Sequence, residues 1–143
     1  MLRIIGTAIG LLALGSVAAH AGDPRGTWFT EEQKSQVKIA DCGAVLCGTI
    51  VSLKDPNDPK TGKPVADDQN PDAGKRGRPL IGVEIVIGMK PTGADKWSGQ
   101  VYNVSDGKTY SGNITMSGDN TLKLQGCAMG GLLCKTQTWT RAN

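Results

Sequence analysis

The stretch of sequence that decides the fold is KTYSGNITMSGDNTLKLQG, residues 108–126. It contains two runs in which apolar and polar side chains alternate, separated by Ser-Gly-Asp-Asn at 117–120. A period of two is typical of β-strands, and glycine, aspartate and asparagine are typical of the turns between them. The stretch therefore predicts a β-hairpin, because alternation places four apolar side chains on one face: Tyr110, Ile114, Leu122 and Leu124.

The same pattern recurs along the chain after residue 21. Glycine, proline, asparagine and aspartate separate short runs of period two, and no long helical period occurs there. Eight strands in sequence are typical of an all-β, antiparallel, up-and-down barrel, which also hides the edges of its sheet. An open β-sandwich is the alternative that the pattern leaves open. The expected strands are 26–31, 36–41, 47–53, 81–88, 96–104, 108–116, 121–126 and 135–141.

Residues 1–21 have the organisation of a secretory signal peptide. Arg3 supplies a positive n-region, Ile4 to Val17 form an uncharged apolar run, and Ala19-His20-Ala21 is a small-x-small cleavage site. A membrane anchor is the alternative, but the run falls short of the roughly 20 residues needed to cross a bilayer. We therefore expect an exported protein that is cleaved after Ala21 and has no membrane span in its mature form.

Removal of this segment leaves 122 residues with a formal charge of +2. That length fits a single domain, residues 22–143. Near-neutral charge of mixed sign argues against a nucleic-acid partner, which requires clustered lysine and arginine. The single histidine, His20, lies in the signal segment, so the mature chain has no imidazole for catalysis or metal binding. We expect neither a metal nor a cofactor.

Four cysteines form two close pairs, Cys42 with Cys47 and Cys127 with Cys134. An even number of cysteines in an exported chain indicates disulfides. Three connectivities exist, and the two local bonds are favoured because each pair flanks a short turn between strand patterns. Four thiolates around a structural zinc ion are the alternative reading.

One long loop interrupts the strand pattern between the third and fourth expected strands, at residues 54–79. Loops of this length are uncommon in compact domains and often serve as lids or binding loops. The other interpretation is an Ω-loop in which arginines pair with acidic side chains or cap backbone carbonyls. A calcium site is a further alternative, although the spacing of the aspartates matches no EF-hand. The candidate loop site comprises Asp68, Asn70, Asp72, Arg76 and Arg78.

Short motifs follow one another along almost the whole mature chain. They include Gly26-Thr27-Trp28, Cys42-Gly43, Leu46-Cys47-Gly48, Asn70-Pro71-Asp72, Arg78-Pro79-Leu80, Trp97-Ser98-Gly99, Gly107-Lys108-Thr109-Tyr110, Gly126-Cys127 and Gln137-Thr138-Trp139-Thr140-Arg141. In this order they resemble the DUF2147 family of exported bacterial proteins, which has no established activity. The resemblance implies a lipocalin-like barrel in the bacterial periplasm that holds a small apolar or amphiphilic molecule, and it supplies no catalytic residues.

A second resemblance concerns the two ends of the mature chain. Gly26-Thr27-Trp28 and Arg141 are similar to the Gly-x-Trp of the first strand and the arginine of the last strand in lipocalins. A guanidinium stacked on an indole would close one end of the barrel. Trp28 and Arg141 are therefore expected to be structural residues.

An eight-stranded barrel is just wide enough to be filled by its own side chains or to hold one small ligand. A ligand would contact inward aliphatic residues, with aromatic residues near a mouth. Plain core is the competing interpretation of these side chains. The candidate lining comprises Val83, Ile85, Ile87, Ile114 and Leu122, with Trp97, Tyr102 and Tyr110 near the mouth.

Two other function classes remain open. One is a structural or interaction protein of the cell envelope. The other is a hydrolase that uses two carboxylates as acid and base, drawn from Asp67, Asp68, Asp72 and Glu84. We expect a non-enzymatic protein, and the sequence leaves its oligomeric state open.

Overall fold

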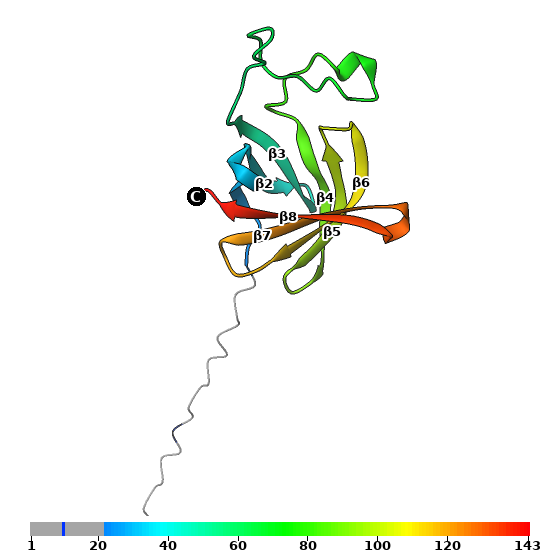
Figure 1. Cartoon of the computed structure of the whole chain (residues 1–143). Coiled ribbons are helices and arrows are strands. Elements are labelled where there is room, and N and C mark those ends of the chain that lie inside the picture. The colour runs from blue at the N-terminus through cyan, green and yellow to red at the C-terminus, as the bar shows by residue number, and fades with distance from the viewer. Residues whose placement is uncertain (1–9, 11–21) are drawn as a thin grey trace, which may run out of the picture.

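The computed structural model describes residue 10 and residues 22–143, and the expected signal segment lies outside these residues except for Gly10. Eight antiparallel strands form a closed barrel in chain order, with β8 beside β1 (Figure 1). This confirms the predicted all-β, up-and-down barrel and rules out the open sandwich. The strands are β1 (Gly26–Phe29), β2 (Ser35–Cys42), β3 (Val45–Leu53), β4 (Glu84–Gly93), β5 (Lys96–Asn103), β6 (Lys108–Met116), β7 (Thr121–Ala128) and β8 (Leu133–Arg141).

Three short 3-10 helices lie in the connections: η1 (Glu31–Gln33), η2 (Ala73–Lys75) and η3 (Met129–Gly131). Within the described residues, no helix has the length and apolar character required to cross a membrane. The hairpin turns at 43–44, 94–95 and 117–120 lie at one end of the barrel, called here the closed end. The long 54–83 connection and the β5–β6 and β7–β8 connections lie at the other, called here the open end (Figure 1).

The inner face of the barrel is an apolar core. Alternate side chains of a strand point to the same face, and the buried positions of paired strands are opposite each other. Trp28 pairs with Val37, and Ile114 pairs with both Trp97 and Leu124. Fully or almost fully buried apolar side chains come from every strand: Trp28, Val37, Ile39, Leu46, Ile50, Val86, Met89, Trp97, Val101, Ile114, Met116, Leu122, Leu124 and Trp139.

The prediction that Val83, Ile85 and Ile87 share the inner face of β4 was wrong. Val86 is fully buried, whereas its neighbours Ile85 and Ile87 are only half-buried. Val83 is buried but precedes the strand, and its backbone bonds to Ile50 of β3. Register shifts on both sides of β4 break the simple period of two. Alternation counted from Val83 therefore reaches the wrong face.

The closed end is sealed by Trp28 and Arg141. The guanidinium lies 4.3 Å from the centre of the indole ring. Its nitrogens donate to the backbone oxygens of Asp119, Arg25 and Asp23 at 2.7, 2.8 and 2.6 Å. The indole N–H donates to Pro24 O at 2.8 Å, so the tryptophan has a polar partner although it is fully buried. One arginine of β8 thus connects the segment just before β1 to the β6–β7 turn.

Both predicted disulfides are confirmed, because Cys42 bonds Cys47 and Cys127 bonds Cys134. The first closes the β2–β3 hairpin and the second closes the β7–β8 hairpin, where Cys127 and Cys134 are opposite one another in register. Each bond therefore constrains a local turn.

Candidate functional site

The long loop at the open end is organised around one carboxylate, Asp67, which is fully buried. Its oxygens accept hydrogen bonds from the Tyr102 hydroxyl at 2.6 Å, from Asn70 Nδ2 at 2.8 Å and from Arg78 Nε at 2.9 Å. Arg78 Nη2 also lies 2.9 Å from Asp67, which completes an ion pair. Because Tyr102 belongs to β5, these bonds attach the loop to the wall of the barrel.

Opposing effects set the pKa of Asp67. Burial alone raises the pKa of this carboxyl, but the hydrogen bonds from Tyr102, Asn70 and Arg78, together with the Arg78 charge, outweigh burial and leave it below its usual value. Burial and the bond to Asp67 raise the pKa of Tyr102 to about 12. At neutral pH the pair therefore consists of an ionised carboxylate and a neutral phenol that donates to it.

The residues predicted as a loop site hold the loop in shape. Asn70 accepts from Asp72 N, and Asp72 caps η2 by accepting from Gly74 N. Arg76 donates to Asn70 O at 2.8 Å, and Arg78 contacts Asp67. Asp68 is exposed. This arrangement matches the Ω-loop interpretation, in which arginines pair with a carboxylate and cap a carbonyl.

The loop also rests on the β5–β6 turn. Gly107 has a φ of +71°, and a Cβ placed on it would lie 1.8 Å from the carbonyl oxygen of Gln69. Only glycine fits both this left-handed conformation and this close approach. The loop is therefore held at one side by Tyr102 and at the other by the backbone of the turn.

A groove with a volume of about 590 Å³ lies at the open end beside this loop. The start of β6 and the end of β7 form two sides, and Pro71 of the loop forms a third. Tyr110 lines it, and a hydrogen bond to Asp106 raises the pKa of the Tyr110 hydroxyl. The complete lining is Pro71, Gly107, Lys108, Thr109, Tyr110, Ser111, Cys127, Ala128, Met129 and Gly130.

Most residues predicted to line a ligand site lie elsewhere. Trp97, Ile114 and Leu122 are buried in the core, and Tyr102 anchors the loop. Of the eight candidates, Tyr110 alone lines the groove. Sequence reasoning missed Ala128 and Met129 because they follow the period-two run that ends at 126. The apolar Met129 to Leu133 segment between the two cysteines was the available signal.

The middle of the barrel is filled by its own atoms. A Cβ added to Gly48 would lie 2.8 Å from Cβ of Val86, and one added to Gly112 would lie 2.7 Å from Cγ1 of Val101. Both distances are shorter than ordinary contact, so neither inward-facing glycine position can accept an additional methyl group without movement of a neighbour. The core around these two glycines is therefore closely packed.

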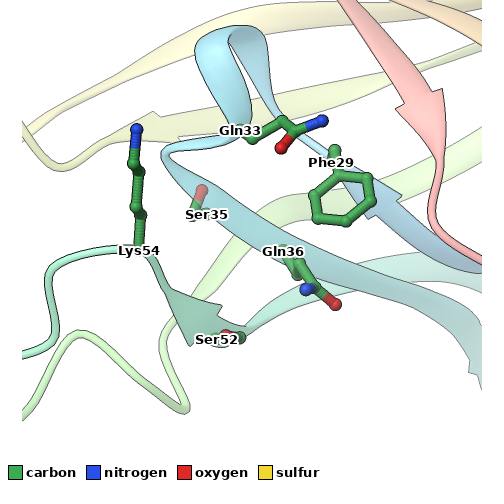
Figure 2. A pocket seen from close by; sticks show the side chains of 6 residues that line it. All are labelled: Phe29, Gln33, Ser35, Gln36, Ser52 and Lys54. Carbon is green, nitrogen blue, oxygen red and sulfur yellow. The ribbon is translucent and has the colours of Figure 1, made fainter.

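A smaller hollow of about 230 Å³ lies where β1, β2 and β3 end at the same side of the barrel (Figure 2). Its lining is mainly amide and hydroxyl groups, with the Phe29 ring at one side and the Lys54 side chain at the other (Figure 2). Its volume is below the roughly 300–1,000 Å³ of typical small-molecule sites. Among the residues that the structure describes, there is no group of three or more side chains suited to hold a metal ion.

The closed, eight-stranded, up-and-down antiparallel barrel is a lipocalin-like fold. A solved structure described as "Protein HP1028 from the human pathogen Helicobacter pylori belongs to the lipocalin family" is similar to it with a TM-score of 0.72. The two chains are 24% identical, and the match covers 85% of this chain and 84% of that one. No curated protein matches the chain. Residues 26–141 match the model of DUF2147, described as an uncharacterized protein conserved in bacteria, and the chain belongs to that family.

Proposed function

We propose that this protein is a non-enzymatic binding module that holds one small amphiphilic molecule in the groove at the open end of the barrel. The observation that carries the proposal is the groove itself, an open surface groove whose volume of about 590 Å³ lies within the range of small-molecule sites. The lipocalin-like fold agrees with it, because the mouths of β-barrels are among the places where small-molecule sites occur.

The lining of the groove favours a molecule with an apolar part and an anionic head. Tyr110, Ala128, Met129 and Pro71 offer apolar surface, whereas the exposed Lys108 offers a cation at the same groove. A carboxylate or phosphate group would pair with this ammonium while the apolar part covers the ring and the thioether. A fatty acid has this chemistry.

The alternative of a carboxylate-dependent hydrolase has less support. A catalytic acid or base needs a carboxyl group that can exchange protons with a substrate. Asp67 is fully buried and bonded to three side chains, and Asp72 caps η2. These partners assign both carboxylates to holding the loop, which supports a binding role over an enzymatic one.

We also place this activity in the periplasm. The signal-like segment at residues 1–21 supports export. The two disulfides support an oxidising compartment, where such bonds form and persist. Sequencing the N-terminus of protein recovered from the periplasmic fraction tests this, and a chain that begins at Gly22 is the expected result.

Titration with a fluorescent fatty acid tests the binding site. Ala128→Phe should fill the groove and weaken binding at least tenfold, because the added ring occupies the space of the ligand. Ala44→Phe places the same ring on the exposed β2–β3 turn at the closed end and should leave the affinity unchanged. Thermal unfolding of each variant establishes that the barrel is intact.

Two outcomes would contradict the proposal. One is Ala128→Phe that binds the fatty acid as tightly as the wild type. The other is wild-type protein that shows no thermal shift with fatty acids or lysophospholipids and carries no small molecule by mass spectrometry when purified gently from its native envelope. The second outcome would favour a structural or interaction protein of the envelope.

A further inference from the structure

The end of the β7–β8 hairpin carries three exposed apolar side chains. Met129, Leu132 and Leu133 are 70%, 82% and 62% exposed. They lie within five consecutive residues, and the two between them are glycines without side chains. Exposed hydrophobic residues that occur singly need no explanation, whereas a cluster marks a surface that meets a partner or a membrane. We call residues 129–133 the apolar tip.

The apolar tip is presented on a braced support. Cys127 and Cys134 close the hairpin on either side of it, and β7 and β8 pair from Thr121 with Thr140 up to Ala128 with Leu133. The end of this hairpin extends away from the body of the barrel (Figure 1). A segment that is already fixed in shape loses little conformational entropy on binding.

The hairpin that carries the apolar tip has basic but no acidic side chains, and the carboxylate of Asp106 accepts from Tyr110, which lines the adjoining groove. Residues 121–143 contain no aspartate or glutamate. Lys135 is exposed two residues after Leu133, and Lys108 lines the groove that also includes Met129. Arg141 is occupied at the closed end by Trp28 and backbone carbonyls. Apolar side chains with lysines beside them match a surface that has an apolar interior and an anionic outer layer.

We propose that the apolar tip inserts into the surface of an anionic lipid bilayer. Met129, Leu132 and Leu133 enter the boundary between headgroups and acyl chains, and Lys135 and Lys108 remain among the anionic headgroups. Because Met129 also lines the groove, docking brings the groove to the lipid surface. This goes beyond the proposed binding function, since it specifies where the protein meets amphiphilic molecules.

Flotation with lipid vesicles tests the proposal. The sample is protein that lacks residues 1–21, verified by intact mass, since the complete barrel lies within residues 26–141. Vesicles of phosphatidylglycerol and phosphatidylethanolamine should bind the protein at least tenfold better than vesicles of pure phosphatidylcholine. The reason is that each lysine near an anionic surface strengthens binding about fivefold. The double variant Leu132→Ser, Leu133→Ser should lose at least tenfold in partitioning. Ile81→Ser, which removes an apolar side chain that is 46% exposed elsewhere, should bind as the wild type does.

A second measurement gives a positive signal. Leu132→Trp should show a blue-shifted fluorescence with anionic vesicles and quenching by brominated acyl chains. Wild-type protein that does not float, or a double variant that floats equally well, overturns the proposal. A dimer in solution that the same double variant abolishes, without vesicle binding, assigns the apolar tip to a second copy instead. Leu132 and Leu133 do not line the groove, so fatty-acid binding by the double variant separates this result from the test of the proposed function.

Discussion

Asp67 shows how much of the open end depends on one side chain. Among the described residues it is the only charged side chain that is fully buried. Four donor atoms from Tyr102, Asn70 and Arg78 surround its carboxylate. A buried carboxylate without such partners would be strongly destabilising. Its partners belong to the loop and to β5, so their assembly requires the folded barrel.

Asp67→Asn should lower the free energy of unfolding by about 2–4 kcal/mol, because it removes the charge that three donor side chains surround. Urea denaturation at pH 7 measures the change. Asp68→Asn is the matched control, since the neighbouring side chain is exposed and should change stability by less than about 0.5 kcal/mol. Equal effects of the two substitutions would contradict the central role of Asp67.

The same pair of variants has a defined pH dependence. The folded-state pKa of Asp67 is lowered, so its contribution is fully present above the unfolded pKa of about 3.9 and is lost as pH falls through the folded value. The stability difference between wild type and Asp67→Asn should therefore be constant near neutrality and shrink below about pH 4. A difference that grows on acidification would contradict this assignment.

Sequence reasoning reached the neighbourhood of Asp67 but not the residue. The loop site was predicted from the density of aspartate, asparagine and arginine, and this included Asn70 and Arg78. Which aspartate is buried depends on Tyr102, which lies 35 residues further along the chain. A local sequence pattern carries no information on a contact between residues so far apart. Asp67 and the exposed Asp68 therefore look equivalent in the sequence.

At the scale of elements, the loop and the β5–β6 turn form a contact between backbones. The carbonyl of Gln69 occupies the space that a Cβ on Gly107 would need. Pro71, two residues later, lines the groove. The loop can therefore bring Pro71 to the groove only because residue 107 is a glycine.

Gly107→Ala should detach the loop from the turn and lower stability by about 2–4 kcal/mol, from the left-handed φ and the collision together. Limited trypsin digestion should then cut faster after Lys60 and Lys75. Gly62→Ala is the control, because Gly62 has a similar φ of +69° but open space around it. Its cost should be about 1 kcal/mol, and equal digestion of the two variants would argue against the contact.

All eight strands were predicted from alternation and turn residues, because each strand buries one face and pairs with its neighbour in sequence. The inner face of β4 was not predicted correctly. Register shifts around Gly48 and beyond Ile87 break the alternation, so Val86 faces the core where Ile85 was expected to. The groove was missed for a related reason. Its walls come from a turn, a loop and a hairpin end, whose meeting is set by tertiary structure.

At the scale of the whole molecule, the barrel has one weak seam. β5 and β6 pair at eight positions, whereas β1 and β8 pair at two, Trp28 with Arg141 and Phe29 with Thr140. Beyond these two pairs, Thr138 N–H of β8 donates to the side chain of Glu31 at 3.2 Å. Directly after β8, Ala142 N–H donates to Thr27 O at 2.8 Å, and Asn143 Oδ1 accepts from Thr27 N–H at 3.3 Å. These few bonds and the arginine that stacks on Trp28 together hold the seam closed.

Hydrogen exchange measured by mass spectrometry should find the seam. Amides of β1 and the β1-facing amides of β8 should exchange faster than those of β5, because fewer backbone bonds must open. Arg141→Lys should accelerate exchange at the seam while leaving β5 unchanged, since a lysine lacks the planar fork that reaches three carbonyls. Uniform exchange across all strands would contradict a weak seam.

The stacking of Arg141 on Trp28 also bears on the order in which the strands of the barrel assemble during folding. Strands β1 to β7 can pair before β8 is in place, since each finds a partner next to it in sequence. Until β8 has joined them, the sheet keeps two free edges and the indole of β1 has no cation above it. The contact between Arg141 and Trp28 therefore forms only when β8 joins β1, and a chain in which β8 is unpaired remains an open sheet.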